Sequence, residues 1–171
     1  MINREQLNKF KTEIEKFIID GEHSFLFLQG DSGSGKTTAI KELIKEVRQR
    51  ESRNFITYLH APLPATERNI YQALLLSLQL NFTVKRTQFE MFKIVENVIS
   101  VTFGETGVPT VFVIDDAENL KFGNWSQSIE SFKQLAEIAG AKFIFCSAKD
   151  LVPSTPISIL RKSCTHRLET A

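Results

Sequence analysis

An eight-residue run from Gly30 to Thr37 combines three glycines, a lysine and a hydroxyl side chain at a spacing that suits phosphate chemistry. It fits the pattern G-x-x-x-x-G-K-S/T. Glycines allow a tight curl whose backbone N–H groups converge on an anion, and a following helix directs its positive dipole end at the same point. We therefore expect phosphate contacts from Gly30, Asp31, Ser32, Gly33, Ser34, Gly35, Lys36, Thr37 and Thr38.

The segments on either side of this run support a nucleotide site. Residues 25–28 are an apolar Phe-Leu-Phe-Leu run typical of a buried strand, and residues 39–47 carry apolar side chains at helical spacing. Lys36 is a flexible cation suited to β- and γ-phosphates, and the Thr37 hydroxyl is a suitable ligand for Mg²⁺. The alternative is a glycine turn that only caps a helix. The complete octet between a strand and a helix favours the nucleotide site.

Two adjacent carboxylates follow a second apolar run. The segment 111–114 reads Val-Phe-Val-Ile and is followed by Asp115 and Asp116. The carboxyl end of such a strand is expected beside the phosphate loop, where Asp115 would hold Mg²⁺. Asp116 would orient and deprotonate a water for attack on the γ-phosphate. Glu118 is the rival base and ranks second because it lies beyond the strand end. A pair of acids that only solvates a strand end is the alternative.

A serine closes another apolar strand. Ser147 follows the run 141–146, and a hydroxyl at that strand end can reach the γ-phosphate or the attacking water. We therefore regard Ser147 as a candidate sensor of the nucleotide. A serine that merely ends a strand is the alternative.

Strand-like and helix-like segments alternate along the chain, which predicts an α/β fold with a five-stranded parallel sheet flanked by helices. The expected strands cover about 24–29, 54–60, 110–114, 141–146 and 164–169. The expected helices cover 3–19, 36–50, 70–80, a segment starting after Thr87 and ending by Gly104 or Gly107, and 125–139. The fourth of these is expected to bury a stripe of Phe89, Phe92, Val95, Ile99 and Phe103. We predict one domain over residues 1–171.

Composition limits the function classes. The 171 residues include 21 basic and 20 acidic side chains, so any nucleic-acid binding must come from a local patch. The apolar stretches are far too short to span a membrane, and the amino terminus has no signal-peptide core. The two cysteines, Cys146 and Cys164, suggest a reducing compartment. We expect a cytoplasmic protein.

On the motifs at 30–37 and 111–116 and the spacing of five strands, the chain resembles the AAA+ ATPases over nearly its whole length. Within them it is most similar to the TniB/TnsC-type transposition ATPases, relatives of the phage Mu B protein. The narrower resemblance rests on a short helix before the first strand, on the segments 58–62 and 113–120, and on the helix 125–139.

The resemblance implies a three-layer P-loop NTPase that binds ATP and Mg²⁺, hydrolyses ATP, and assembles with itself into rings or filaments. It implies duplex DNA and an effector such as a transposase as partners. An arginine acting on the neighbouring subunit is expected at Arg161, just before the fifth strand, ahead of Arg167 inside it. Lys85 and Arg86, in the loop before a helix, are the expected contacts to DNA phosphates.

Two departures from the family accompany this resemblance. The family usually has Asp-Glu where this chain has Asp115 and Asp116, which is compatible with slow hydrolysis. Such proteins also carry a helical lid after the fifth strand, and this chain ends at Ala171. We expect that the lid is absent or has been removed.

Three other functions stay open. A helicase loader or replication initiator would share Asp115-Asp116 and act on another partner. A small P-loop metabolite kinase would need an arginine-rich lid and a substrate carboxylate after the second strand. The second strand instead leads into His-Ala-Pro at 60–62 and no arginine cluster follows the third, which argues against a kinase. The third open function is that of a scaffold that binds ATP without hydrolysing it.

Overall fold

Five parallel strands form the centre of the computed structural model, which describes residues 4–50, 55–81 and 85–167. Their order across the sheet is β2-β3-β4-β1-β5. The strands are β1 (Phe25–Gln29), β2 (Ile56–His60), β3 (Val111–Asp115), β4 (Lys142–Ser147) and β5 (Ser163–Arg167). The predicted α/β class with a five-stranded parallel sheet is confirmed.

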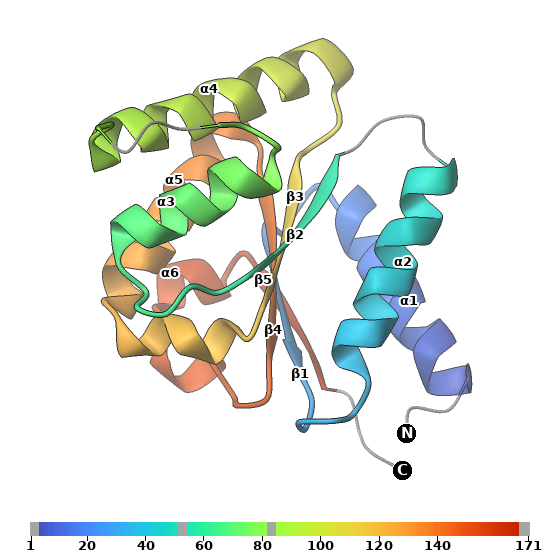
Figure 1. Ribbon diagram of the computed structural model, residues 1–171. Coiled ribbons are helices and arrows are strands. Elements are labelled where there is room, and N and C mark those ends of the chain that lie inside the picture. The colour runs from blue at the N-terminus through green and yellow to red at the C-terminus, as the bar shows by residue number, and fades with distance from the viewer. Residues whose placement is uncertain (1–3, 51–54, 82–84, 168–171) are drawn as a thin grey trace.

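Helices cover both faces of this sheet (Figure 1). One face is covered by α1 (Arg4–Ile19) and α2 (Lys36–Arg50), and the other by α3 (Glu67–Ser77), α4 (Gln88–Thr106) and α5 (Trp125–Ala139). A short helix α6 (Ile157–Leu160) and two 3₁₀ turns, η1 (Ala117–Phe122) and η2 (Val152–Ser154), complete the described elements. No helix in the described ranges is long and apolar enough to cross a membrane.

Strands β1, β3 and β4 are largely apolar because both faces of the sheet are buried there, whereas the edge strand β5 is polar and only partly buried. Phe143 and Phe145 of β4 pack under α3, α4 and α5, whereas Ile144 between them packs under α1 and α2. The ring of Phe143 lies 5.4 Å from Phe112 of β3 and 4.8 Å from Phe132 of α5, measured between centroids. This packing holds β3 and β4 together, so the acids that end β3 have a fixed position beside the end of β4.

Helix α4 differs from the expected pattern. It starts after Thr87, as expected, with a capping box: the Thr87 side chain accepts from the backbone N–H of Glu90, and the Glu90 side chain accepts from that of Thr87. The predicted buried stripe is wrong at two positions: Phe89 is 69% exposed and Phe103 is 43% exposed. Glu96 is buried. The helix therefore exposes two aromatic side chains and largely buries a carboxylate.

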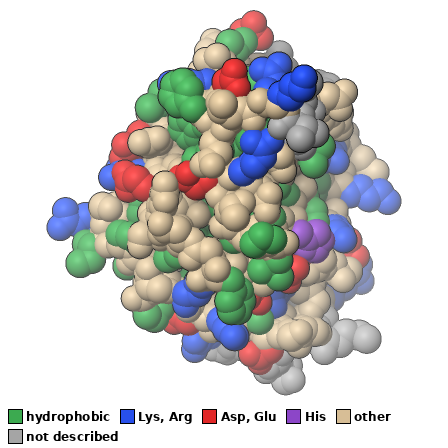
Figure 2. All heavy atoms as spheres, turned by 60° about the vertical axis from the view of Figure 1, so that its left-hand side comes forward, with side chains coloured by type: hydrophobic (Ala, Val, Ile, Leu, Met, Phe, Trp, Pro, Cys, Tyr) green, Lys and Arg blue, Asp and Glu red, His purple; other side chains and the backbone are tan. Residues whose placement is uncertain are grey.

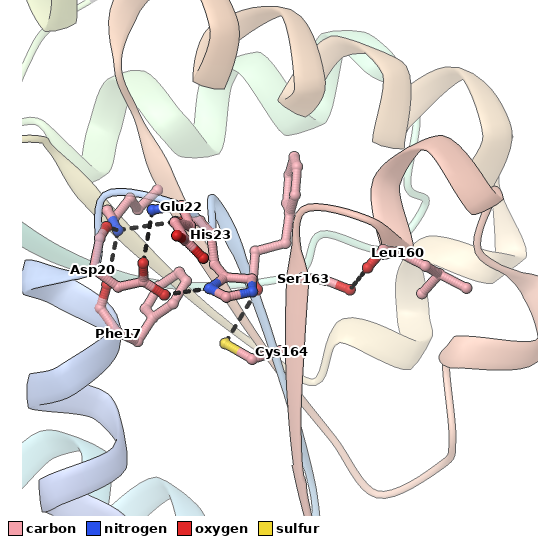
Figure 3. Close-up of polar contacts among 9 residues, drawn as sticks. Phe17, Asp20, Glu22, His23, Leu160, Ser163 and Cys164 are labelled. Carbon is pink, nitrogen blue, oxygen red and sulfur yellow. Dashed lines mark hydrogen bonds and ion pairs between the residues drawn. The ribbon is translucent and has the colours of Figure 1, made fainter.

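A buried lysine fixes the end of α1 to the sheet. The Lys142 ammonium, at the start of β4, donates to the carbonyl oxygens of Phe17, Asp20 and His23. In the same turn, the Asp20 carboxylate accepts from the backbone N–H of Glu22 and is hydrogen-bonded to the His23 ring (Figure 3). The turn between α1 and β1 is therefore fixed at the edge of the sheet opposite the glycine-rich loop.

Candidate nucleotide-binding site

The loop after β1 adopts the backbone that its glycines permit. Gly33 and Gly35 have φ angles of 79° and 88°, in the region that side chains with a Cβ rarely adopt. The Gly30 N–H donates to the Ser147 carbonyl at 3.1 Å, which ties the loop to the end of β4. The loop leads directly into α2, so the amino end of a 15-residue helix opens at this point. This arrangement suits an anion.

Lys36 lies inside the loop. The residue is 8% exposed, and its ammonium donates to the carbonyl oxygens of Gly30 and Asp31 and to the Ser34 hydroxyl. The contacts to Asp31 and Ser34 are 2.8 Å and 3.4 Å long. A buried cation within a curl of glycine backbone fits a polyphosphate, because it offers charge and N–H donors in one place. Ser34 is buried with it, whereas Asp31, Ser32 and Thr38 are exposed.

The two predicted motifs meet at Thr37 and Asp115. The Thr37 hydroxyl donates to Asp115 Oδ2 at 2.6 Å, although 78 positions separate them in the sequence. Asp115 is 3% exposed, and its Oδ1 accepts from the backbone N–H of Asp116 at 3.0 Å. A hydroxyl and a carboxylate in contact fit Mg²⁺, which uses few protein ligands and retains water. The described residues contain no group of three or more His, Cys, Asp or Glu side chains that could hold a metal.

Strand β2 supplies two partners that the sequence analysis did not assign to the site. The Tyr58 hydroxyl donates to Asp115 Oδ2 at 2.7 Å, and burial together with that carboxylate raises the pKa of the phenol, which therefore stays a donor. The His60 ring contacts Asp116 Oδ2 at 3.0 Å and the Tyr58 hydroxyl at 3.3 Å. The sequence signal for these two partners is that Tyr58 and His60 stand at alternate positions at the end of β2, the strand that pairs with β3.

The two candidate bases have different surroundings. Asp116 has a left-handed backbone (φ 52°), and its exposed side chain faces His60. Glu118, in η1, accepts at 3.5 Å from the backbone N–H of Ala148 after β4. Its other oxygen is buried and has no hydrogen-bond partner among the described residues. Water therefore has access to the carboxylate of Asp116, whereas one oxygen of Glu118 is closed off.

The remaining predicted residues lie at or beyond the edge of this site. Ser147 is next to the loop through its carbonyl, but its hydroxyl donates to the Lys149 carbonyl at 2.6 Å within its own turn. Arg161 is exposed after α6. Arg167 ends β5 and donates to the Gln29 side chain at 3.1 Å and 3.3 Å, close to where the loop begins.

The two basic residues predicted to contact DNA lie on the surface. Lys85 and Arg86 are exposed just before α4. The carbonyl oxygen of Arg86 accepts from Arg68 at 2.8 Å, which links this segment to α3. Neither residue contacts the phosphate loop in the described contacts.

A glycine loop between β1 and α2, with a threonine and an aspartate in contact at neighbouring strand ends, defines the class of P-loop α/β folds. More specifically, the chain belongs to the AAA domain family, whose model matches residues 19–153. No curated protein matches the chain in sequence.

Solved structures share the fold at low identity. Cdc6p from Pyrobaculum aerophilum is 18% identical with a TM-score of 0.67, over 94% of this chain and 44% of that one. Drosophila ORC bound to DNA is 18% identical with a TM-score of 0.68, over 97% and 46%. Aeropyrum pernix ORC2, solved as ADPNP–ADP complexes, is 12% identical with a TM-score of 0.69, over 98% and 47%. The chain spans less than half of each. These comparisons do not confirm the narrower resemblance to transposition ATPases.

The geometry predicts how two substitutions change nucleotide binding. Lys36→Met removes the buried cation and is expected to weaken ATP binding at least about tenfold, or ~1.4 kcal/mol. Asp115→Asn is expected to weaken binding in the presence of Mg²⁺ and to change binding in EDTA by less than about twofold, because it removes a metal ligand and leaves Lys36 and the glycine loop unchanged. Titration calorimetry with ATP, with and without Mg²⁺, measures both.

Lys45→Met is the matched control, since Lys45 is exposed on the same helix. Wild-type affinity in Lys36→Met would remove the phosphate-loop assignment. Equal losses in EDTA and in Mg²⁺ for Asp115→Asn would remove the metal role of Asp115.

Proposed function

We propose that this chain is an AAA-type ATPase switch that binds ATP with Mg²⁺, assembles with copies of itself on duplex DNA, and regulates an effector protein. The observation that carries the ATPase part is the 2.6 Å contact between Thr37 and Asp115. This contact joins the end of the glycine-rich loop to β3, the strand that ends in Asp115. Cytoplasmic location and the single-domain organisation stay predictions from the sequence.

The class of effector follows from two kinds of support. The fold neighbours include Cdc6p and ORC proteins, and both Drosophila ORC and Aeropyrum pernix ORC1 were solved with DNA. They favour a switch of the replication-initiator or helicase-loader kind. A transposase effector rests on the motif resemblance alone, and we keep it as the second candidate.

The residues of the site have separate tasks in the proposed hydrolysis. The Lys36 ammonium binds the phosphates, and Asp115 is oriented by the Tyr58 hydroxyl and the Asp116 N–H. Asp116 takes the proton of the attacking water, because its carboxylate is exposed to solvent and adjacent to Asp115. The His60 ring holds the Asp116 carboxylate in place. Bound Mg²⁺ supplies positive charge that offsets the charge developing on the phosphates.

The choice of base gives a direct test of hydrolysis. Asp116→Asn is expected to lower ATP turnover by about 100-fold or more while ATP binding is retained, because the proton acceptor is removed. Glu118→Gln is expected to lower turnover less than about tenfold, since its buried oxygen is closed to water. Phosphate release with and without duplex DNA measures both, with Glu42→Gln on the exposed side of α2 as the control.

The reverse order of these effects would assign the base to Glu118. No turnover in the wild-type chain, despite ATP binding and added DNA, would favour a scaffold that only binds ATP.

Assembly is tested by complementation. If Arg161 acts on the nucleotide of a neighbouring subunit, Arg161→Ala and Asp116→Asn proteins are each expected to be inactive alone. A mixture should regain turnover, because one interface then combines a native arginine with a native base. Phosphate release of the mixture, with sedimentation velocity in ATP and Mg²⁺, checks this expectation. Arg50→Ala is the control, since Arg50 is also an exposed arginine. A mixture no more active than its components would exclude Arg161 as the arginine acting in trans.

DNA binding by Lys85 and Arg86 has a salt signature. Each phosphate contact contributes a slope of about 0.9 to the fall of log K with log salt. Replacing both by alanine is therefore expected to reduce the slope by about 1 to 2. Fluorescence anisotropy of labelled duplex DNA at several salt concentrations measures it. The paired control is Lys41→Ala with Lys45→Ala on α2, and an unchanged slope in the Lys85/Arg86 variant would reject these contacts.

A further inference from the structure

The outer faces of α3, α4 and α5 enclose a groove of about 530 Å³ that the nucleotide site does not use. Among the described residues, its lining comes from these three helices, and none of it belongs to the phosphate loop or to a strand. Figure 2 brings this side of the molecule forward and shows acidic side chains close to hydrophobic ones on it. A groove of this size accommodates a few side chains of a peptide.

The apolar part of the groove is formed by residues that a monomer would ordinarily bury. Phe89 is 69% exposed and Ile138 is 64% exposed, and both line the groove together with the partly buried Phe92. The wrong prediction that Phe89 is buried has its physical reason here, because α4 turns this ring toward the groove. Exposed aromatic and aliphatic side chains around one hollow are typical of an interaction surface.

The charged part of the groove is acidic. Glu67, Glu96 and Glu130 line it, against Lys93 as the single basic lining residue. Lys93 donates to Glu96 Oε1 at 2.9 Å and lies 5.8 Å from the centre of the Phe89 ring. The Lys133 ammonium, outside the lining, lies 3.6 Å from Glu130 Oε1, so three carboxylates face two ammonium groups. The remaining negative charge favours a cationic partner.

The buried carboxylate of Glu96 indicates which kind of chemical group would bind in the groove. The residue is 8% exposed, and its Oε2 is buried without a hydrogen-bond partner among the described residues. A buried carboxylate oxygen without a donor is costly, and a cationic donor would satisfy it. An arginine suits this position, because its guanidinium carries five donors and can bond Oε2 once the Glu96 side chain turns that oxygen toward the groove, while Lys93 keeps Oε1.

We propose that this groove binds a segment of a partner protein that presents an arginine between apolar side chains. The guanidinium would bond Glu96, and the apolar side chains would pack on Phe89 and Ile138. The proposal does not depend on ATP binding, since the groove and the phosphate loop share no residue. It supplies a surface through which the effector of the proposed switch can be held.

The test uses a fluorescein-labelled helical peptide of alanine and glutamine with leucine, arginine and leucine at positions i, i+3 and i+7. Wild-type protein is expected to bind it at least about tenfold more tightly than the same peptide with glutamate in place of arginine, measured by fluorescence polarisation. Glu96→Gln is expected to abolish most of this preference, and Phe89→Ala to weaken binding of the arginine peptide at least about threefold.

Glu105→Gln and Val101→Ala are matched controls, since both residues are exposed on α4 and neither lines the groove. Both controls should bind like the wild type, and the ATP affinity of Glu96→Gln should be unchanged, which separates a lost site from a lost fold. Equal binding of the two peptides, or an arginine preference that survives Glu96→Gln, would overturn the proposal. So would a wild-type dimer in sedimentation that Phe89→Ala dissociates while the peptide does not bind, because the groove would then be occupied by a second copy.

Discussion

The arrangement of the site depends on one constraint, the adjacency of β3, β4 and β1 in a parallel sheet. Parallel strands end at the same edge, so the loop after β1 and the acids that end β3 come together there. The Gly30 N–H reaches the Ser147 carbonyl across this edge, and Thr37 reaches Asp115. The aromatic packing of Phe112 and Phe143 keeps the strands in register below. The position of residues 30–37 beside Asp115 and Asp116 thus depends on core packing by residues in other parts of the chain.

Much of this arrangement could be predicted because local signals coincide with the fold. The bounds of α2 and α5 were predicted at 36–50 and 125–139 and are observed there, since the glycine loop sets the start of α2 and left-handed Gly140 ends α5. Gly107, with a φ of 67°, ends α4, whereas Gly104 lies inside that helix. The strands are within two residues of their expected bounds wherever they are described. Residues 54, 168 and 169 of the expected strands lie outside the described ranges.

The features that could not be predicted are set by tertiary contacts. The spacing of Phe89 and Phe103 fits a buried helical stripe, but α4 is rotated so that Met91, Val95 and Ile99 carry the core. Helix α3 begins at Glu67, three residues before its expected start, because Thr66 caps it. Partners that depend on which strands are neighbours, such as Tyr58 for Asp115, become visible only once β2 lies beside β3.

The lysine at the start of β4 has a mechanical consequence for the amino-terminal helix. Three carbonyl oxygens at and after the end of α1 share the Lys142 ammonium, and the ring of Phe17 lies 4.7 Å below it. Swinging α1 away from the sheet would break the hydrogen bonds of this ammonium to the end of the helix and its contact with the Phe17 ring. The carboxyl end of α1 is therefore anchored to the first residue of β4.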